Sequence, residues 1–421
     1  MRTLIHRISE LGPVGPGMVP VTAEALDKGD FMHQAWVVVS DDRIQSIGTG
    51  MPPDGPFDLS VDADGGAVIP AFVDCHTHLV FAAWRQDEFV RKLRGESYAD
   101  IARSGGGILN SASRLRDCSE DELFDGAWKR LNELMRLGTG AVEVKSGYGL
   151  TVESELKMLR VARRLGSESG IPVRTTFLGA HAVPAGMTKE DYVKVVIDEM
   201  IPAVSSGRLA DFIDVFCEDG FFTYDETLRI LEAGKRSGLV PRVHAHQLNR
   251  SGGVRAGVQA GARSVDHLEQ FNDEDLRILK GSGVYPVLLP GAAFFLGLPF
   301  PPARLMQQAG LPIVVASDYN PGSSPSGNML TMWSMACSGM RLSPRAALQA
   351  MTVNPACLMD LQTTHGSIAP GKSASLILTH PMPSVEFIPY RPGMPAIRGV
   401  MINGRYSESS TRNDRSRSHD A

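Results

Sequence analysis

The segment Cys75-His76-Thr77-His78 follows an apolar run at residues 67–74 and places two imidazoles two positions apart. Side chains alternate along an extended strand, so His76 and His78 point to one side while Cys75 and Thr77 point to the other. Two imidazoles on one side at the end of a buried strand form half of a metal site. An isolated H-x-H is more simply interpreted as a pair of surface histidines, so other residues have to decide whether this pair belongs to a metal site.

Three further polar residues end or follow other apolar segments of the chain, and these are His244, His267 and Asp318. If the segments are parallel strands of one barrel, their C-terminal ends meet at the face where such barrels carry their chemistry. Imidazole and carboxylate ligands suit Zn²⁺ or iron, and do not suit Ca²⁺ or Mg²⁺. The sequence therefore predicts a metal site made of His76, His78, His244 and Asp318.

This arrangement predicts a hydrolytic reaction. A metal with an open coordination position lowers the pKa of bound water to about 7. Asp318 can bind the metal, accept the proton of the water and pass it to a leaving nitrogen. His267 is placed to orient the nucleophile or polarise the carbonyl that is attacked. We expect hydrolysis of a C–N bond.

The elements that must position these residues form a repeating pattern. Apolar β-rich segments alternate with amphipathic stretches such as 153–165 and 223–235, which is typical of parallel strands covered by helices. The number of β-rich segments matches a (β/α)₈ barrel, an α/β fold of the TIM type. The segments are 72–75, 141–145, 173–178, 212–216, 240–245, 264–266, 285–289 and 313–317.

Both ends of the chain carry short alternating segments separated by turns, such as 35–39 and 375–378. We expect the two ends to pair into one small β-sandwich beside the barrel. The expected division is 1–67 for the first part of the sandwich, 68–365 for the barrel, 366–406 for the second part, and 407–421 for a disordered tail rich in Ser, Arg and Asp.

Composition excludes several classes of protein. The 421 residues are 43% hydrophobic and 21% charged, with a net charge of -5, so no basic surface for nucleic acid is expected. No stretch approaches the roughly 20 apolar residues of a membrane helix, and the N-terminus lacks the core of a secretory signal. Five scattered cysteines favour a reducing cytoplasm. We expect a cytoplasmic homodimer that acts on a small molecule, with no nucleic acid or membrane partner.

Longer stretches of the chain resemble the amidohydrolase superfamily and, within it, the imidazolonepropionase family. The motifs KSGYGL, FLGAHAVP and NPGSSP occur at 145–150, 177–184 and 320–325, and the stretches 73–82, 104–108 and 288–296 are also similar. The resemblance implies one Zn²⁺ or Fe³⁺ per subunit. It also implies hydrolytic ring opening of 4-imidazolone-5-propanoate to N-formimidoyl-L-glutamate, a step of L-histidine degradation.

The same resemblance implies substrate contacts at matching positions. Arg85 matches the arginine that holds the propionate carboxylate, which suits a guanidinium fork. Three further residues match positions that contact the substrate around its ring, and these are Tyr148, His181 and Gln247. Asn320, Gly322 and Ser323 match contacts from the loop after the eighth strand. Gln247 is also a candidate for catalysis. Tyr98 and the glycines at 105–107 are further candidates for the pocket.

Several positions bear on the number of metals and on specificity. Binuclear relatives bridge two metals with a lysine of the fourth strand, and segment 212–218 has none, which favours one metal. Lys145 instead ends the second strand, where it anchors an anion or caps the barrel. His246 stands where the family usually has an acidic residue, and Trp84 precedes Arg85, so the substrate preference is open at these positions.

Three other functions stay open on the sequence. A different amidohydrolase, such as a hydantoinase-like cyclic amidase or an aminohydrolase, would share the metal site, and an aminohydrolase would release ammonia. A catalytically inactive binding or scaffold protein would be expected to lack a metal ligand. A metal-storage role would be expected to show tracts rich in His or Cys, and the sequence has none.

Overall fold

A parallel barrel forms the larger part of the computed structural model, which describes residues 1–96, 100–101 and 106–409. Its strands are hydrogen-bonded in the order β13-β12-β11-β10-β9-β8-β7-β6, with parallel pairing throughout. The predicted (β/α)₈ barrel is confirmed. The strands are β6 (Phe72–Asp74), β7 (Thr139–Lys145), β8 (Val173–Ala180), β9 (Phe212–Cys217), β10 (Val240–Ala245), β11 (Ser264–His267), β12 (Tyr285–Leu288) and β13 (Val314–Val315).

The barrel closes between its first and last strands through the segments that follow them. The backbone N–H of Asp318 donates to the carbonyl of His76 at 3.0 Å, and His78 N–H donates to the carbonyl of Tyr319 at 2.9 Å. Below this point the buried Asp74 carboxylate accepts from Ser317 N at 3.1 Å and from Ser317 Oγ at 2.5 Å. The closure therefore brings the H-x-H segment next to Asp318.

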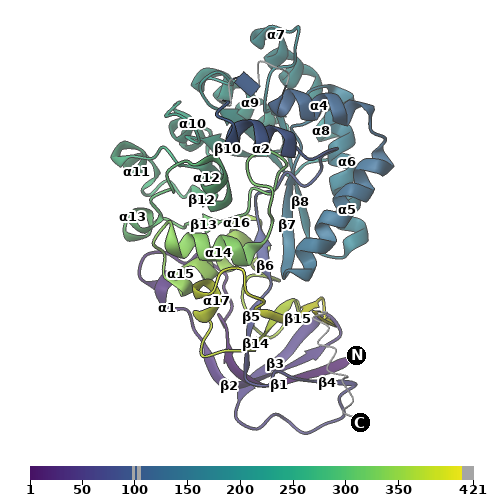
Figure 1. Cartoon of the computed structure of the whole chain (residues 1–421), viewed down its shortest axis with the longest axis vertical. Coiled ribbons are helices and arrows are strands. Elements are labelled where there is room, and N and C mark those ends of the chain that lie inside the picture. Colours follow the sequence, from purple (N-terminus) through teal and green to yellow (C-terminus); the bar gives the residue numbers. More distant parts are fainter. Residues whose placement is uncertain (97–99, 102–105, 410–421) are drawn as a thin grey trace.

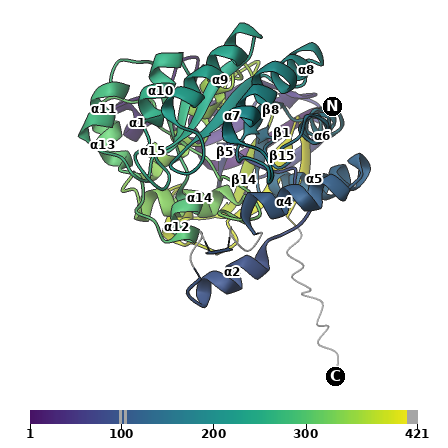
Figure 2. The same cartoon turned by 90° about the horizontal axis from the view of Figure 1, so that it is seen from above.

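Helices surround the barrel strands, and α2 projects to one side (Figure 2). Their starts follow local sequence: Ser119 and Thr223 form capping boxes with Glu122 and Glu226, which satisfy exposed backbone N–H groups. The helices of the barrel are α2 (Gln86–Leu93), α4 (Gly107–Asp117), α5 (Glu120–Arg136), α6 (Val152–Ser169), α7 (Lys189–Lys194) with the π-helical turn η1 (Val195–Met200) and α8 (Ile201–Ser206), α9 (Tyr224–Arg236), α10 (Gly253–Ala260), α11 (Asp273–Leu279), α12 (Pro290–Leu296), α13 (Ala303–Gln308), α14 (Met329–Ser338), α15 (Pro344–Ala350) and α16 (Val353–Leu358).

The main hydrophobic core lies between the strands and these helices. Phe177, Ile213, Val243 and Val265 belong to four successive strands and are fully buried in one cluster with residues of the covering helices. Cys75 is also fully buried, in a cluster with Val73 and Ala316, and so packs into the core. Packing of apolar faces thus fixes the frame that carries the polar ends of the strands.

The two chain ends build a second, mixed sheet below the barrel in Figure 1. Its path is β16-β15-β14-β5-β1-β2-β3, with β4 paired to β1, so strands of both ends join where β14 pairs antiparallel with β5. The elements are β1 (Arg2–Leu11), β2 (Met32–Ser40), β3 (Arg43–Thr49), β4 (Leu59–Asp62), β5 (Gly66–Pro70), β14 (Leu376–Pro381), β15 (Ile397–Ile402), β16 (Arg405–Glu408) and the short helices α1 (Ala25–Lys28) and α17 (Phe387–Tyr390).

The last strand extends into the segment expected to be disordered. Ser407 pairs with Val400 and Glu408 with Gly399, so β16 includes the first two residues of the expected tail 407–421. Pairing with β15 satisfies backbone groups of these two polar residues, next to Tyr406, which packs against the core of the terminal sheet. Residues 410–421 lie outside the described part of the chain. Within the described part, no helix is long and apolar enough to span a membrane.

Candidate metal centre and substrate pocket

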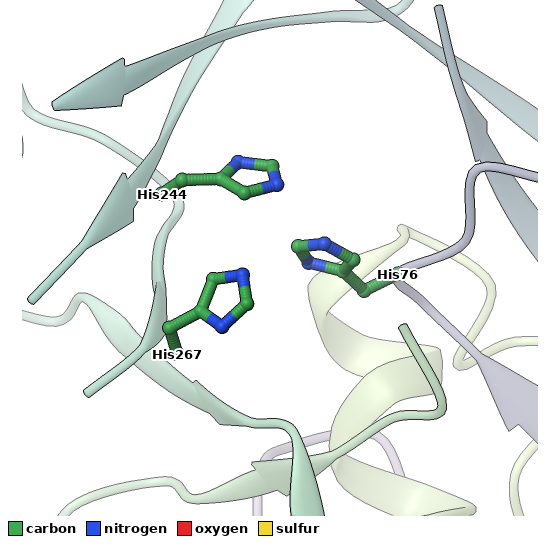
Figure 3. A group of neighbouring side chains, drawn as sticks. All are labelled: His76, His244 and His267. Carbon is green, nitrogen blue, oxygen red and sulfur yellow. The ribbon is translucent and has the colours of Figure 1, made fainter. Parts of the chain in front are cut away.

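Five polar side chains meet at the C-terminal end of the barrel. Two overlapping groups bring one ligand atom from each residue within 4.8 Å of the others: His76, His244 and His267, and His76, His78 and Asp318. Figure 3 shows the rings of the first group pointing toward a shared space from three different elements. All five side chains are buried. The arrangement matches the chemistry of a Zn²⁺ or iron site.

Two of the imidazoles are oriented by carboxylates of other barrel strands, Asp266 of β11 and Asp214 of β9. His76 Nδ1 lies 2.6 Å from Asp266 Oδ2, and His244 Nδ1 lies 3.0 Å from Asp214 Oδ2. A carboxylate only accepts, so we infer that each ring carries its proton on Nδ1. Both Nε2 atoms are buried and have no hydrogen-bond partner among the described residues. Metal-binding histidines are commonly held in this way, with the other nitrogen bound to a carboxylate.

Lys145 lies beneath these histidines in a network of buried charges. Its Nζ donates at 2.9 Å both to Glu143 Oε1 and to Asp214 Oδ2. Arg242 Nη2 donates to Asp266 Oδ2 at 2.7 Å. Of the two roles considered for Lys145, the structure favours binding of anions, and these anions are carboxylates of the protein itself. The two cations balance the carboxylates that orient the histidines.

Asp318 is placed by its own loop. Its Oδ1 lies 3.5 Å from Nε2 of both His76 and His78. Asn320 Nδ2 donates to the Asp318 carbonyl at 2.6 Å, and Ser323 Oγ donates to Asp318 Oδ2 at 3.3 Å. Burial raises the pKa of the Asp318 carboxyl to about 7, partly opposed by the charge of His267.

His267 faces the same space from β11. Burial lowers the pKa of His267, but the negative charge of Glu269 and the contact between His267 Nδ1 and Glu269 Oε1, at 3.3 Å, raise it on balance. The backbone φ of His267 is 87°, in the left-handed region that is uncommon for residues other than glycine. Such conformations occur often at functional sites, where the surrounding structure enforces them.

A pocket opens above the five polar side chains. It is lined by all seven substrate contacts that the family resemblance implies, namely Arg85, Tyr148, His181, Gln247, Asn320, Gly322 and Ser323. His78, His244, His267 and Asp318 form its floor side. Segments that are far apart in the sequence therefore supply one site. Tyr98 and Gly105 lie outside the described residues, and Gly107 starts α4.

The Arg85 guanidinium lies against the loop that follows β13. A Cβ atom added to Gly322 would come within 2.4 Å of Arg85 Nη1, so only glycine leaves room for the guanidinium in this position. Arg85 itself is only 8% exposed. A buried guanidinium at one end of a pocket is a strong recognition group for a carboxylate.

The His181 ring lies between the KSGYGL loop and the polar cluster. Its Nδ1 is 3.0 Å from the carbonyl of Gly147, and the ring stacks on His78 with centroids 5.4 Å apart. Burial, with a smaller effect of His244, lowers the pKa of His181 to about 3. The imidazole is therefore neutral, and its Nε2 is suited to accept a hydrogen bond if Nδ1 donates to Gly147.

Sequence reasoning missed part of the pocket wall, which also includes Lys92, Ile108, Phe216, Leu248 and Leu296. One signal was available for Lys92, since it lies about two helical turns after Arg85, the residue that immediately precedes α2. His246 does not line this pocket; its Nδ1 lies 3.4 Å from Asp275 Oδ2 of α11. The side chain of Trp84, the other position at which the substrate preference was left open, is 41% exposed.

Comparison with known proteins agrees with this geometry. The sequence model of the amidohydrolase family matches residues 67–406. The chain is 45% identical to an imidazolonepropionase of Christiangramia forsetii over 96% of this chain and 100% of that protein, and 46% identical to one of Flavobacterium johnsoniae over the same shares. An imidazolonepropionase of Shewanella frigidimarina is 42% identical, over 88% and 92%. The chain belongs to the imidazolonepropionase family of amidohydrolases. Amidohydrolases are metal-dependent, and the buried histidine cluster could hold a metal ion.

Two solved structures share the fold of this amidohydrolase at low identity. An adenosine deaminase from Xanthomonas campestris with bound zinc has a TM-score of 0.68 at 16% identity, over 96% of this chain and 92% of that one. A mutant atrazine chlorohydrolase from Arthrobacter aurescens, complexed with zinc and atraton, has a TM-score of 0.74 at 15% identity, over 96% and 94%. At such identity the similarity concerns the fold alone.

Proposed function

We propose that this protein catalyses the hydrolytic ring opening of 4-imidazolone-5-propanoate to N-formimidoyl-L-glutamate in L-histidine degradation. The observation that carries the proposal is the pocket, which has a buried guanidinium, that of Arg85, in its wall and a cluster of three histidines and Asp318 on its floor side. A substrate with a carboxylate on a short arm and a hydrolysable ring amide matches these two features. The imidazolonepropionases at 42–46% identity support the same assignment.

We propose one Zn²⁺ or Fe³⁺ per subunit, held by His76, His78, His244 and Asp318. The buried Nε2 atoms of His76 and His244, which lack partners among the described residues, fit this role. The ion would lower the pKa of a water molecule to about 7 and polarise the ring carbonyl. This leaves His267, whose Nδ1 faces Glu269 and whose ring lines the pocket, for the substrate.

The side chains of the wall bind and orient the substrate. Arg85 pairs with the propionate carboxylate, and the backbone of Gly322 keeps the guanidinium in place. His181, Tyr148 and Gln247 surround the imidazolone ring, with the neutral His181 as an acceptor for a ring N–H. Asn320 and Ser323 hold the loop that carries Asp318.

Proton transfer follows from the position of Asp318. Its carboxylate accepts a proton from the attacking water as the new C–O bond forms at the ring carbonyl. The same proton then passes to the ring nitrogen as the C–N bond breaks, so that one water is consumed and no ammonia leaves. His267 donates a hydrogen bond to the carbonyl oxygen on which negative charge develops. Gln247, which lines the pocket, would hold the ring during this transfer.

A single assay separates this function from its competitors. Purified protein with its metal content measured is mixed with 4-imidazolone-5-propanoate, and the loss of imidazolone absorbance and the release of ammonia are followed together. Loss of absorbance without ammonia is expected. Ammonia release would indicate an aminohydrolase, and metal-containing protein without turnover would indicate a binding protein or another cyclic amidase.

We further propose that the protein is a cytoplasmic homodimer. All five cysteines are free thiols in the structure, as expected of a protein from a reducing compartment. Light scattering on the purified protein gives the mass of the particle, and a value near that of one chain would contradict the homodimer.

A further inference from the structure

Glu88 lies in the first turn of α2, three residues after Arg85, and is only 6% exposed. Its Oε2 accepts a hydrogen bond from Arg85 Nε at 2.9 Å and lies 2.8 Å from Nη2 on the same edge of the guanidinium. Two contacts from one edge of the guanidinium to the same carboxylate oxygen restrict its orientation more than a single contact would. Glu88 therefore determines how Arg85 is oriented.

The other oxygen of the same carboxylate is bound to a second helix. Glu88 Oε1 accepts from the backbone N–H of Gly107 at 2.9 Å and from Asn110 Nδ2 at 3.3 Å, both at the start of α4. Burial alone would raise the pKa of the Glu88 carboxyl, but the contacts with Arg85 lower it on balance. The ionised carboxylate thus joins the start of α2 to the start of α4.

The far side of the guanidinium is also restricted. Arg85 Nη1 lies where a side chain at position 322 would begin, against the backbone of Gly322. The Arg85 guanidinium is thus held between Glu88 and Gly322, and Arg85 and Gly322 both line the substrate pocket. Glu88 is not among the residues that line the pocket, so it acts on the substrate only through Arg85.

We propose that Glu88 is a positioning residue, which fixes the Arg85 guanidinium so that it binds the carboxylate of the substrate. This inference rests on the proposed function, since it takes the propionate as the partner of Arg85. A competing role is possible in chemical terms, in which Glu88 occupies Arg85 and has to be displaced by the substrate. The two roles predict opposite effects on substrate binding when Glu88 loses its charge.

The test compares three variants by steady-state kinetics: Glu88→Gln, Glu88→Asp and the control Asp87→Asn. Glu88→Gln keeps the size of the side chain, and we expect KM to rise about tenfold while kcat changes less than about threefold. Glu88→Asp keeps the charge but is too short to reach both helices, so a smaller rise in KM is expected. Asp87 is an exposed neighbour in the same helical turn, and its substitution should leave KM unchanged.

A double-mutant cycle with Arg85→Ala separates positioning from a general effect on the fold. In the Arg85→Ala background, Glu88→Gln should change KM by less than about twofold, because the group that it positions is gone. Equal effects in both backgrounds, or a fall in KM in Glu88→Gln, would overturn the proposal. If Glu88→Gln does not fold, the same cycle with Glu88→Asp decides. Absence of turnover in the wild-type protein would count against the proposed function instead, and is measured first.

Discussion

The two overlapping groups of possible ligand atoms do not by themselves tell which histidine binds the metal and which binds the substrate. His244 and His267 both approach His76, yet we assign the first to the metal and the second to the substrate. The difference lies in the partners of Nδ1: Asp214 belongs to the buried network with Lys145, whereas Glu269 follows the strand that carries His267. The two histidines should therefore respond differently to substitution.

His244→Ala should lose its metal together with its activity. Metal affinity should fall by more than about 100-fold, because removing a ligand should cost more affinity than removing the residue that orients a ligand. His267→Ala should keep about one metal per subunit while kcat falls by about 10²–10⁴-fold. Metal analysis after gel filtration and steady-state kinetics on the same samples check both. If His267→Ala lost its metal and His244→Ala retained it, His267 would be the metal ligand and His244 the substrate contact.

Asp318→Asn tests the proton transfer. The amide keeps an oxygen near His76 and His78 but cannot accept a proton, so most turnover should vanish across the pH range while metal is partly retained. A loss of about 10²–10⁴-fold in kcat is expected for a general acid–base group. Asp87→Asn provides the matched control. If kcat falls less than about tenfold with metal retained, the base is another group, and His267 is the first candidate.

The sequence predicted the residues that face the pocket better than the buried residues that orient their side chains. The H-x-H pair and Asp318 stood out because each ends an apolar segment. The carboxylates Asp214 and Asp266 were missed, since their partners lie 30 and 190 residues away. A signal was present, because a charged residue within an apolar, buried strand is costly unless it is paired. Only the structure tells which partner pairs with it.

At the scale of elements, the loop after β13 links the carboxylate of Asp318 to the guanidinium of Arg85. Asn320 Oδ1 accepts from the N–H groups of Gly322 at 2.8 Å and of Ser323 at 2.7 Å, which makes the loop compact. The strand pattern predicted this loop as a connection after the eighth strand. Its contact with α2 was not predictable, because the two segments lie more than 200 residues apart.

Gly322→Ala should displace the Arg85 guanidinium, because the added Cβ would lie 2.4 Å from Nη1. The guanidinium is the far end of a flexible side chain, so the protein should still fold. We expect KM to rise about tenfold with kcat reduced less than about threefold. The control is Gly126→Ala in α5, where the nearest atom to the new Cβ is 3.4 Å away. An unchanged KM in Gly322→Ala would show that the Arg85 guanidinium can accommodate the added methyl group and still bind the substrate.

At the scale of the whole molecule, the polar site depends on a frame that uses both chain ends. The alternating segments at the two ends predicted one shared unit, and the structure pairs β14 with β5 accordingly. A boundary between residues 365 and 366 was expected from the sequence, but the contacts that form the junction could not be predicted, because it is made by turns. Lys372 donates to the carbonyl of His365 at 3.0 Å and to Ser367 Oγ at 2.7 Å, after the last helix of the barrel.

His365, in that junction, should make the stability of the protein depend on pH. Burial, with smaller effects of Arg43 and Lys372, lowers the pKa of His365 from 6.5 to about 4. Between these values the unfolded chain takes up a proton that the folded chain does not, so the free energy of unfolding falls as the pH decreases from about 6.5 to about 4. Above the upper value both states are neutral, and the effect is absent. Allowing for partial exposure, the contribution should be about 1–2 kcal/mol.

Urea unfolding of the wild type and of His365→Gln at a series of pH values measures this contribution. The difference in unfolding free energy between the two proteins should be constant above about pH 7 and should shift in favour of His365→Gln as the pH falls toward about 4. His33→Gln, at an exposed position of β2, is the control and should follow the wild type. Parallel curves for wild type and His365→Gln would mean that the junction opens to water and that His365 titrates in the folded protein as it does in the unfolded chain.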